Sequence, residues 1–159
     1  ISIKEVTPPK QVVIPLIQHI GAETKCVVEI GQIVKKGELI GEPTAFVSSA
    51  VHSSVSGKVM AIVKVLTPIG RIAPAVVIEN DGKDDWIELE DNPNYIDFSP
   101  EELKDKIKKA GIVGMGGAAF PTHVKLSPPK DKPIDVVILN GAECEPYLTA
   151  DHRLMVEFS

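Results

Sequence analysis

The chain has 159 residues, of which 43% are apolar and 25% are charged, a balance that is ordinary for a globular protein with a real core. Its net charge of −5, its lack of a basic run and its 4% aromatic content argue against nucleic-acid binding. No apolar stretch approaches the roughly 20 residues that a membrane-spanning helix requires. Because the first residue is Ile and no signal-like segment opens the chain, we expect an excised piece of a longer protein.

The first half of the chain consists of short β-prone runs that are broken by Gly and Pro. The expected strands are 12–14, 26–28, 38–40, 45–47, 57–65 and 75–79. The phrase GQIVKKGELIG at 31–41 and SGKV at 56–59 resemble the turn and strand starts of lipoyl and biotinyl domains. That resemblance implies a barrel-sandwich hybrid over residues 1–80, with tight turns at Gly31 and Gly37.

A carrier function does not follow from this resemblance. A carrier domain needs a lysine at the exposed hairpin tip, which corresponds to residues 42–54. That stretch reads EPTAFVSSAVHSS and contains no lysine. The fold is therefore expected without the covalent carrier chemistry.

The cysteines and histidines do not predict a metal site. Cys26 and Cys144 are the two cysteines, and neither belongs to a C-x-x-C pair. We expect Cys26 to be a small buried apolar residue. Cys144 lies between two glutamates, and we expect it to line a ligand site without being a reactive thiolate. His19 and His52 are expected to be structural, hydrogen-bonded groups because no second ligand lies at metal spacing.

An acidic connector is expected over residues 81–98, with Trp86 and Ile87 packed against a neighbouring domain. A helix should follow, because Ser99 can cap it, Pro100 suits its first position and Glu102 completes a capping box. Its apolar face carries Leu103, Ile107 and Ala110, and Gly111 ends it.

A glycine-rich stretch, GIVGMGGAAFPTHVK, occupies residues 111–125. Glycines allow close approach of the backbone to a ligand, successive N–H groups can hold an anion, and Lys125 adds a positive charge. The stretch therefore favours a cradle for a nucleotide or flavin phosphate, with a flexible turn as the alternative. A standard dinucleotide fingerprint is rejected, because that motif must follow a strand and this one follows a helix.

A second polar cluster follows the apolar run DVVIL at 135–139, which is expected to form a buried strand. Beyond it come Asn140, Glu143 and Glu145 in the stretch NGAECEP. Loops after strands place polar groups around ligands in α/β folds. The alternative is an Asn-Gly turn with solvated acids.

Taken together, GMGGAAFPTHVK and NGAECEPYLTADHRLM resemble the flavin-binding region of the RnfC subunit of the Rnf complex, an ion-translocating ferredoxin:NAD⁺ oxidoreductase. VVIPLIQHIGA and VHSSVSGKV also resemble that family's N-terminal domain. The two motifs resemble, more distantly, the NADH-binding flavoprotein subunit of respiratory complex I. This chain has Met115 where that flavoprotein has an Arg, and Ala142 where that flavoprotein has an Asp.

The resemblance implies an α+β chain, in which the barrel-sandwich hybrid precedes the incomplete start of an α/β FMN- and NADH-binding domain at residues 99–159. It implies FMN and NAD(H) as cofactors, and 4Fe-4S clusters held beyond residue 159. Other Rnf subunits are the implied partners, with the protein peripheral on the cytoplasmic side of the bacterial membrane. The implied cofactor-binding residues are Gly114, Gly116, Gly117, Phe120, Lys125, Asn140, Glu143 and Glu145.

Two alternatives remain open at this point. One is a related flavoenzyme with the same modules, such as a cobalamin reductase. The other is a non-catalytic docking module built on the first domain.

Overall fold

The structure is a computed structural model that describes residues 2–67, 70–114, 119–129, 131, 133–138, 140–143 and 145–158. The chain forms two compact units. One comprises Pro9–Pro128, and the other combines Ile1–Pro8 with Pro129–Ser159.

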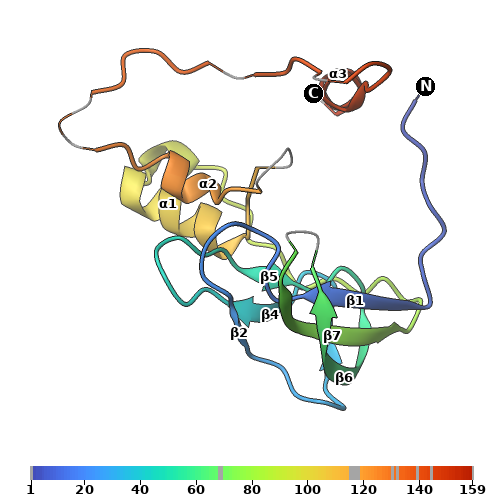
Figure 1. Cartoon of the computed structure of the whole chain (residues 1–159). Coiled ribbons are helices and arrows are strands. Elements are labelled where there is room, and N and C mark those ends of the chain that lie inside the picture. Colours follow the sequence, from blue (N-terminus) through green and yellow to red (C-terminus); the bar gives the residue numbers. More distant parts are fainter. Residues whose placement is uncertain are drawn as a thin grey trace. The chain divides into compact units, whose positions relative to one another are not determined.

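Within its described residues, the first unit has seven strands in two antiparallel sheets (Figure 1). The four-stranded sheet has the order β1-β7-β6-β3, and the three-stranded sheet has the order β2-β4-β5. The strands are β1 (Gln11–Pro15), β2 (Lys25–Cys26), β3 (Ile33–Val34), β4 (Leu39–Glu42), β5 (Val51–His52), β6 (Gly57–Leu66) and β7 (Ile72–Asn80). The longest pairing is the β6–β7 hairpin, which runs from Gly57 opposite Asn80 to Leu66 opposite Ile72.

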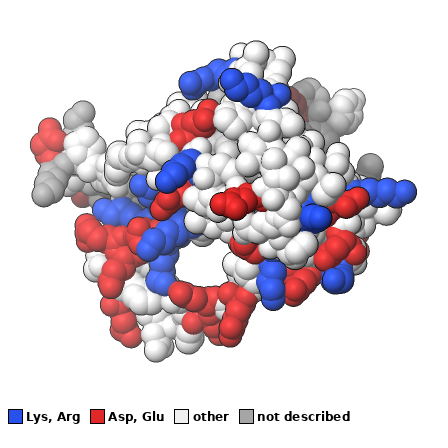
Figure 2. Space-filling view, turned by 90° about the horizontal axis from the view of Figure 1, so that it is seen from below, with Lys and Arg blue, Asp and Glu red and all other residues white. Residues whose placement is uncertain are grey.

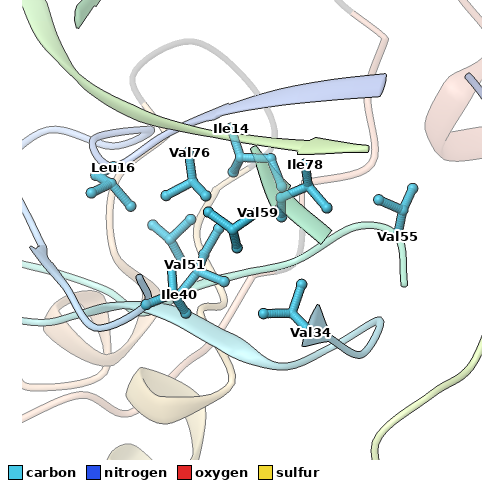
Figure 3. Packing of buried hydrophobic residues seen from close by; sticks show 10 residues of the cluster. Ile14, Leu16, Val34, Ile40, Val51, Val55, Val59, Val76 and Ile78 are labelled. Carbon is cyan, nitrogen blue, oxygen red and sulfur yellow. The ribbon is translucent and has the colours of Figure 1, made fainter. Parts of the chain in front are cut away.

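The core of this unit lies between the two sheets. Val76 and Ile78 of β7 point from the four-stranded sheet toward Ile40 and Val51 of the other sheet (Figure 3). Ile40, Val76 and Ile78 are fully buried. Since full burial of a Val or Ile side chain stabilises a fold by about 1.5–3 kcal/mol, this cluster is a main source of stability for the unit.

Two facing antiparallel sheets around one core confirm the barrel-sandwich hybrid predicted from the sequence. Gly31 and Gly37 adopt φ angles of 91° and 84°, which confirms the two tight turns. Only glycine takes this region without strain. Cys26 is partly buried against the core, as expected, whereas Cys144 lies outside the described residues.

The predicted strand at residues 45–47 is wrong. All three backbone carbonyls of this segment accept hydrogen bonds from outside any strand: from Lys108 Nζ at 3.0 Å, His123 Nε2 at 2.7 Å and the Ala22 N–H at 2.9 Å. These donors satisfy the carbonyls of the segment in place of a neighbouring strand. It forms an irregular loop instead.

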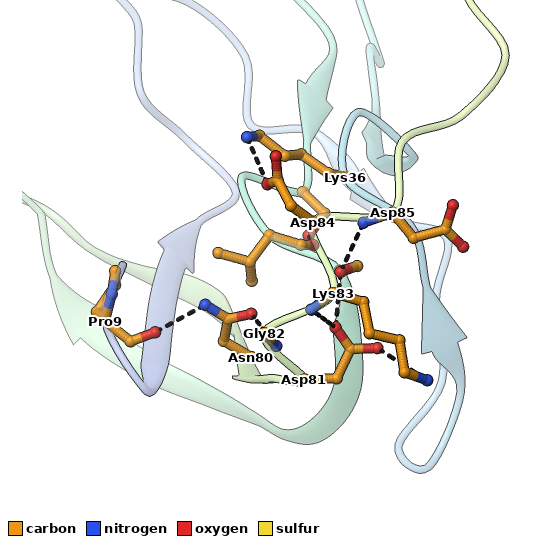
Figure 4. Close-up of polar contacts among 11 residues, drawn as sticks. Pro9, Lys36, Asn80, Asp81, Gly82, Lys83, Asp84 and Asp85 are labelled. Atoms are coloured by element: carbon orange, nitrogen blue, oxygen red, sulfur yellow. Dashed lines mark hydrogen bonds and ion pairs between the residues drawn. The ribbon is translucent and has the colours of Figure 1, made fainter. Parts of the chain in front are cut away.

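A polar turn leads out of β7 into the connector (Figure 4). Asp81 Oδ1 accepts hydrogen bonds from Ser56 Oγ at 2.7 Å and from the Lys83 N–H at 3.0 Å. The Lys83 N–H and the Ser56 hydroxyl hold the pKa of Asp81 below its ordinary value. Asn80 Nδ2 donates to the Pro9 carbonyl at 2.9 Å, so the turn is also bonded to the segment that leads into β1.

The connector packs against the barrel, as predicted for Trp86 and Ile87. Trp86 forms a parallel bridge with Lys36, and the Ile87 N–H donates to the Lys36 carbonyl at 3.0 Å. Lys36 Nζ lies 4.6 Å from the centre of the Trp86 ring and pairs with Asp84 at 2.6 Å. Acidic and basic side chains lie next to one another on the face shown in Figure 2, which accords with such pairs.

The helix after the connector confirms the capping prediction. A short 3₁₀ turn (η1, Tyr95–Asp97) precedes α1 (Pro100–Lys109). Glu102 Oε2 accepts from the Ser99 N–H at 2.8 Å and Ser99 Oγ accepts from the Glu102 N–H at 3.3 Å, which is a complete capping box. The Ser99 N–H lowers the pKa of Glu102.

The second unit contains α3 (Ala150–Glu157). Arg153 pairs with Glu157 on this helix, and Glu157 accepts a hydrogen bond from the Ile3 N–H at 3.2 Å. The strand predicted at 135–139 is wrong for residues 135–138, which form no strand, while Leu139 lies outside the described residues. Val136, Val137 and Ile138 are 72–84% exposed, because the described part of this unit offers them no partner strand.

None of the described helices has both the length and the apolar character needed to cross a lipid bilayer.

Candidate functional site

The glycine-rich stretch begins where α1 ends. Gly111 adopts φ 73°, and its N–H donates to the Lys108 carbonyl at 3.2 Å, so it ends the helix as predicted. A Cβ on Gly111 would lie 2.6 Å from the Ala50 carbonyl oxygen and 3.2 Å from His52 Nδ1. Glycine is therefore required here both by the backbone conformation and by the close approach of the barrel.

Two backbone contacts close the stretch into a loop. Val113 and Pro121 form an antiparallel bridge. Its two hydrogen bonds run from the Gly114 N–H to the Phe120 carbonyl at 2.9 Å and from the Thr122 N–H to the Ile112 carbonyl at 3.1 Å. The loop thus has a fixed neck, and its two ends are held by the same short ladder.

Lys125 reaches back over this neck. It ends α2 (Thr122–Lys125), and its Nζ lies 3.2 Å from the position that a Cβ on Gly114 would occupy. Among the described residues, the exposed Lys125 forms no ion pair. The structure therefore brings Gly114, Phe120 and Lys125 together, whereas Gly116 and Gly117 lie outside the described residues.

Ala119, at the start of the described return segment of the loop, adopts φ 47°. A non-glycine residue in the left-handed region costs roughly 1–2 kcal/mol, and such conformations concentrate at functional sites. The return segment of the loop thus holds an unfavourable backbone conformation in place.

His123 fastens the loop to the barrel, and sequence reasoning missed it. Its side chain is only 3% exposed, its Nε2 donates to the Phe46 carbonyl at 2.7 Å, and its ring meets the Phe46 ring edge-on at 5.7 Å. Because a carbonyl only accepts, Nε2 carries the proton. Nδ1 is buried without a hydrogen-bond partner in the described part of the chain. No spacing rule pointed to this pair, since 77 residues separate its members.

The two histidines considered from the sequence also lie on this side of the barrel. His19 is 1% exposed, and its Nε2 accepts from the Ser49 N–H at 3.0 Å, which confirms a structural role. Burial lowers the pKa of His52, and a contact with the Lys109 backbone partly opposes that shift. Among the described residues, no group of three His, Cys, Asp or Glu side chains is arranged to hold a metal ion.

The second predicted cluster lies in the other unit. Asn140 Oδ1 accepts from the Ala142 N–H at 3.0 Å, so its side chain caps its own turn. Glu143 Oε1 accepts from the His152 N–H at 3.0 Å and thereby satisfies a donor in the first turn of α3. Glu145 is exposed. In this conformation Asn140 and Glu143 serve local hydrogen bonds.

A cavity of about 1010 Å³ in the first unit lies elsewhere. Trp86 and Phe98 of the connector, Lys106 and Lys109 of α1, and His52 are among the residues that line it. In this cavity Lys106 and Lys109 are already paired with Glu90 and Asp105. The cavity is therefore a weaker candidate for binding a phosphate than the glycine loop with Lys125.

Comparison with known proteins identifies both parts of the chain. The RnfC barrel sandwich hybrid domain matches residues 1–83, and the Nuo51 FMN-binding domain matches residues 107–159. A subunit of the proton-translocating ferredoxin:NAD(+) oxidoreductase complex of Clostridium ljungdahlii is 54% identical over 157 residues. A subunit of the Na(+)-translocating ferredoxin:NAD(+) oxidoreductase complex of Acetobacterium woodii is 50% identical over 149 residues.

These matches cover 98% and 92% of this chain but only 34% and 33% of the two relatives. A subunit of the ion-translocating oxidoreductase complex of Pseudomonas aeruginosa is 43% identical over 99% of this chain, which spans 20% of that relative. The chain thus spans about a third or less of the length of these relatives. Since the barrel-sandwich domain alone matches more than half of the sequence, the chain belongs to the RnfC family.

Proposed function

We propose that this chain supplies the barrel domain and the flavin-phosphate loop of a subunit that exchanges electrons between NADH and ferredoxin in an ion-translocating membrane complex. The observation that carries the proposal is the closed loop in which Gly114, Phe120 and Lys125 meet, with no described acidic partner for Lys125. The match of residues 107–159 to an FMN-binding domain and the names of the relatives support it.

The described residues fit the phosphate end of FMN. Gly114 leaves space for a phosphate to approach the backbone, and Lys125 Nζ, which lies at that space, would pair with it. Gly116 and Gly117 would contribute backbone N–H groups, as the family resemblance implies. When bound, FMN itself supplies the chemistry, by accepting a hydride and passing on single electrons.

The remaining assigned residues would act at other parts of the cofactors. Asn140 would hydrogen-bond the flavin, while Glu143 and Glu145 would line the side where NADH binds. For Asn140 and Glu143 this requires exchange of their present bonds with Ala142 and His152. Phe120 would stack on a ring or support the neck of the loop.

We further propose the following organisation for the whole protein. The barrel domain comprises residues 1–80, residues 81–98 connect it, and the FMN/NADH-binding domain starts at residue 99. The 4Fe-4S clusters would be held by residues outside this stretch. The protein would sit peripherally on the cytoplasmic side of the membrane and contact other members of the complex.

The test is the flavin content of the full-length protein, measured beside that of residues 1–159. FMN that purifies with the full-length protein and is bleached by NADH would support the proposal. The Lys125→Met variant should retain less FMN, whereas Lys58→Met, which removes an exposed lysine of β6, should retain the normal amount. Lack of FMN in every preparation, even after reconstitution, would instead favour the docking-module alternative.

A further inference from the structure

The end of the β6–β7 hairpin exposes apolar side chains. We call residues 63–67 and 70–72 the hairpin tip. Leu66 and Ile72 face each other across the two strands and are 73% and 72% exposed. Ile62, which lies on the same face of β6 as Leu66, and Val63, on the other face, are partly exposed as well. Exposed apolar side chains that face each other at the end of a hairpin indicate a contact surface.

The charge around the hairpin tip is opposite in sign to that of the rest of the chain. From Gly57 to Ile78 the sequence has three basic residues, Lys58, Lys64 and Arg71, and no Asp or Glu. With a total of −5, the other residues therefore carry −8. Lys64 and Arg71 are exposed, and among the residues that the structure describes neither forms an ion pair.

The backbone of the hairpin tip is internally satisfied. The Thr67 N–H and hydroxyl both donate to the Arg71 carbonyl, at 2.8 and 2.9 Å, and the Gly70 N–H donates to the Thr67 carbonyl at 2.9 Å. Thr67 itself is only 4% exposed. A tip with these polar groups already paired can enter a poorly hydrated region at little cost.

From these observations we propose that the hairpin tip docks on the anionic surface of a lipid bilayer. Leu66 and Ile72 would enter the headgroup region, while Lys64 and Arg71 would face lipid phosphates. Apolar residues flanked by cations are the usual composition of interfacial anchors. Two cations without a described acidic partner favour phosphates over an uncharged protein groove.

The acidic remainder of the chain does not prevent this contact. Along β7 the first carboxylate is Glu79, seven residues from Ile72, or about 23 Å at the usual strand rise. The Debye length at 0.1 M salt is about 10 Å, so repulsion from such a charge is largely screened. The inference deepens the proposed place of the protein at a membrane, but it does not require flavin binding.

The test is sedimentation of the 159-residue chain with vesicles of phosphatidylserine and phosphatidylcholine at 0.1 M salt, at millimolar lipid. Wild type should bind these vesicles and not vesicles of phosphatidylcholine alone. Removing two cations should weaken binding about 25-fold, since each contributes roughly fivefold near an anionic surface, so Lys64→Gln with Arg71→Gln should bind that much less. Leu66→Ser with Ile72→Ser should also bind at least fivefold less.

Matched controls come from the other end of β6. Ile33 of the neighbouring strand β3 is 67% exposed and lies opposite Lys58, so Ile33→Ser and Lys58→Gln are compared with the single changes Leu66→Ser and Lys64→Gln at the hairpin tip. Both should bind as wild type does. Equal loss in these controls, or no binding by wild type, would overturn the proposal.

A second measurement separates lipid from protein as the occupant. If the tip variants release the full-length protein from its membrane complex while wild type does not bind vesicles, the tip is a protein contact and the proposal is wrong. FMN content is measured separately on the same variants. Lack of FMN would contradict the flavin proposal, whereas lack of vesicle binding would contradict the membrane proposal.

Discussion

Gly111 is the residue at which the helix, the barrel and the glycine loop meet. Its φ of 73° ends α1, and the Ala50 carbonyl oxygen lies 2.6 Å from where a Cβ would be. Gly82 has a nearly identical φ of 71° but has nothing within 4 Å of its Cβ position. Substituting each glycine in turn therefore separates the free-energy cost of the left-handed backbone from that of the clash with the Ala50 carbonyl.

Gly82→Ala should lower the free energy of unfolding by roughly 1 kcal/mol, the cost of placing a side chain in the left-handed region. Gly111→Ala should lower it clearly more, because α1 must also move from the Ala50 carbonyl. Urea denaturation followed by Trp86 fluorescence measures both. Equal losses would mean that Gly111 does not lie in the described contact with the Ala50 carbonyl.

His52 makes the stability of the first unit depend on pH. Burial lowers its pKa in the folded state from the ordinary value of 6.5, so the unfolded chain binds the proton more readily. Stability is therefore full above about pH 6.5 and declines as the pH falls through the lowered pKa. Replacing this group with a residue that does not titrate should flatten that decline.

The expected result is a smaller pH dependence for His52→Gln between pH 7 and pH 5, measured by urea denaturation. Ser54→Ala, which removes no titratable group at an exposed position near His52, should leave the wild-type dependence unchanged. An identical pH slope in wild type and His52→Gln would show that His52 does not titrate differently on folding.

At the scale of single elements, α1 shows how far local rules extend. Its start is specified within four residues by Ser99, Pro100 and Glu102, and its end by Gly111. Ser99→Ala should cost about 1 kcal/mol of stability, because it removes the cap of the Glu102 N–H. Ser54→Ala, at an exposed serine, should stay within about 0.5 kcal/mol. A thermal or urea melt decides, and equal values would contradict the cap.

Strands were predictable to the extent that their partners are local. β6 and β7 are long β-prone runs joined by a short turn, and the sequence predicts both nearly at their bounds. β3 and β5 have two residues each and exist only because β6 and β4 lie beside them. The run at 135–138 has strong β propensity but no described partner, so it forms no strand.

The candidate site was predictable in part for the same reason. Gly114, Phe120 and Lys125 are close in sequence, and the structure brings them together. The contact between His123 and Phe46 joins segments that are far apart in the sequence, and no local sequence pattern predicts it. The assigned roles of Asn140, Glu143 and Glu145 remain predictions.

At the scale of the whole molecule, the barrel acts as a support for the loop. The 42–54 segment, where a carrier domain would hold its modified lysine, instead contacts Lys108, His123 and Gly111 after the end of α1. In this chain the segment therefore supports α1 and α2 and has no lysine to modify. A barrel that fixes the neck of the glycine loop would hold the proposed phosphate site in place before a cofactor binds.

The most direct measurement compares FMN with riboflavin, which lacks the phosphate, in binding to the full-length protein and its Lys125→Met variant. A charge-assisted hydrogen bond contributes about 1.5–3 kcal/mol, so Lys125→Met should raise the Kd for FMN by roughly tenfold or more. The Kd for riboflavin should stay unchanged, and Lys58→Met should alter neither. Equal weakening of FMN and riboflavin, or an unchanged Kd for FMN, would contradict the assignment of the glycine loop as the flavin-phosphate site.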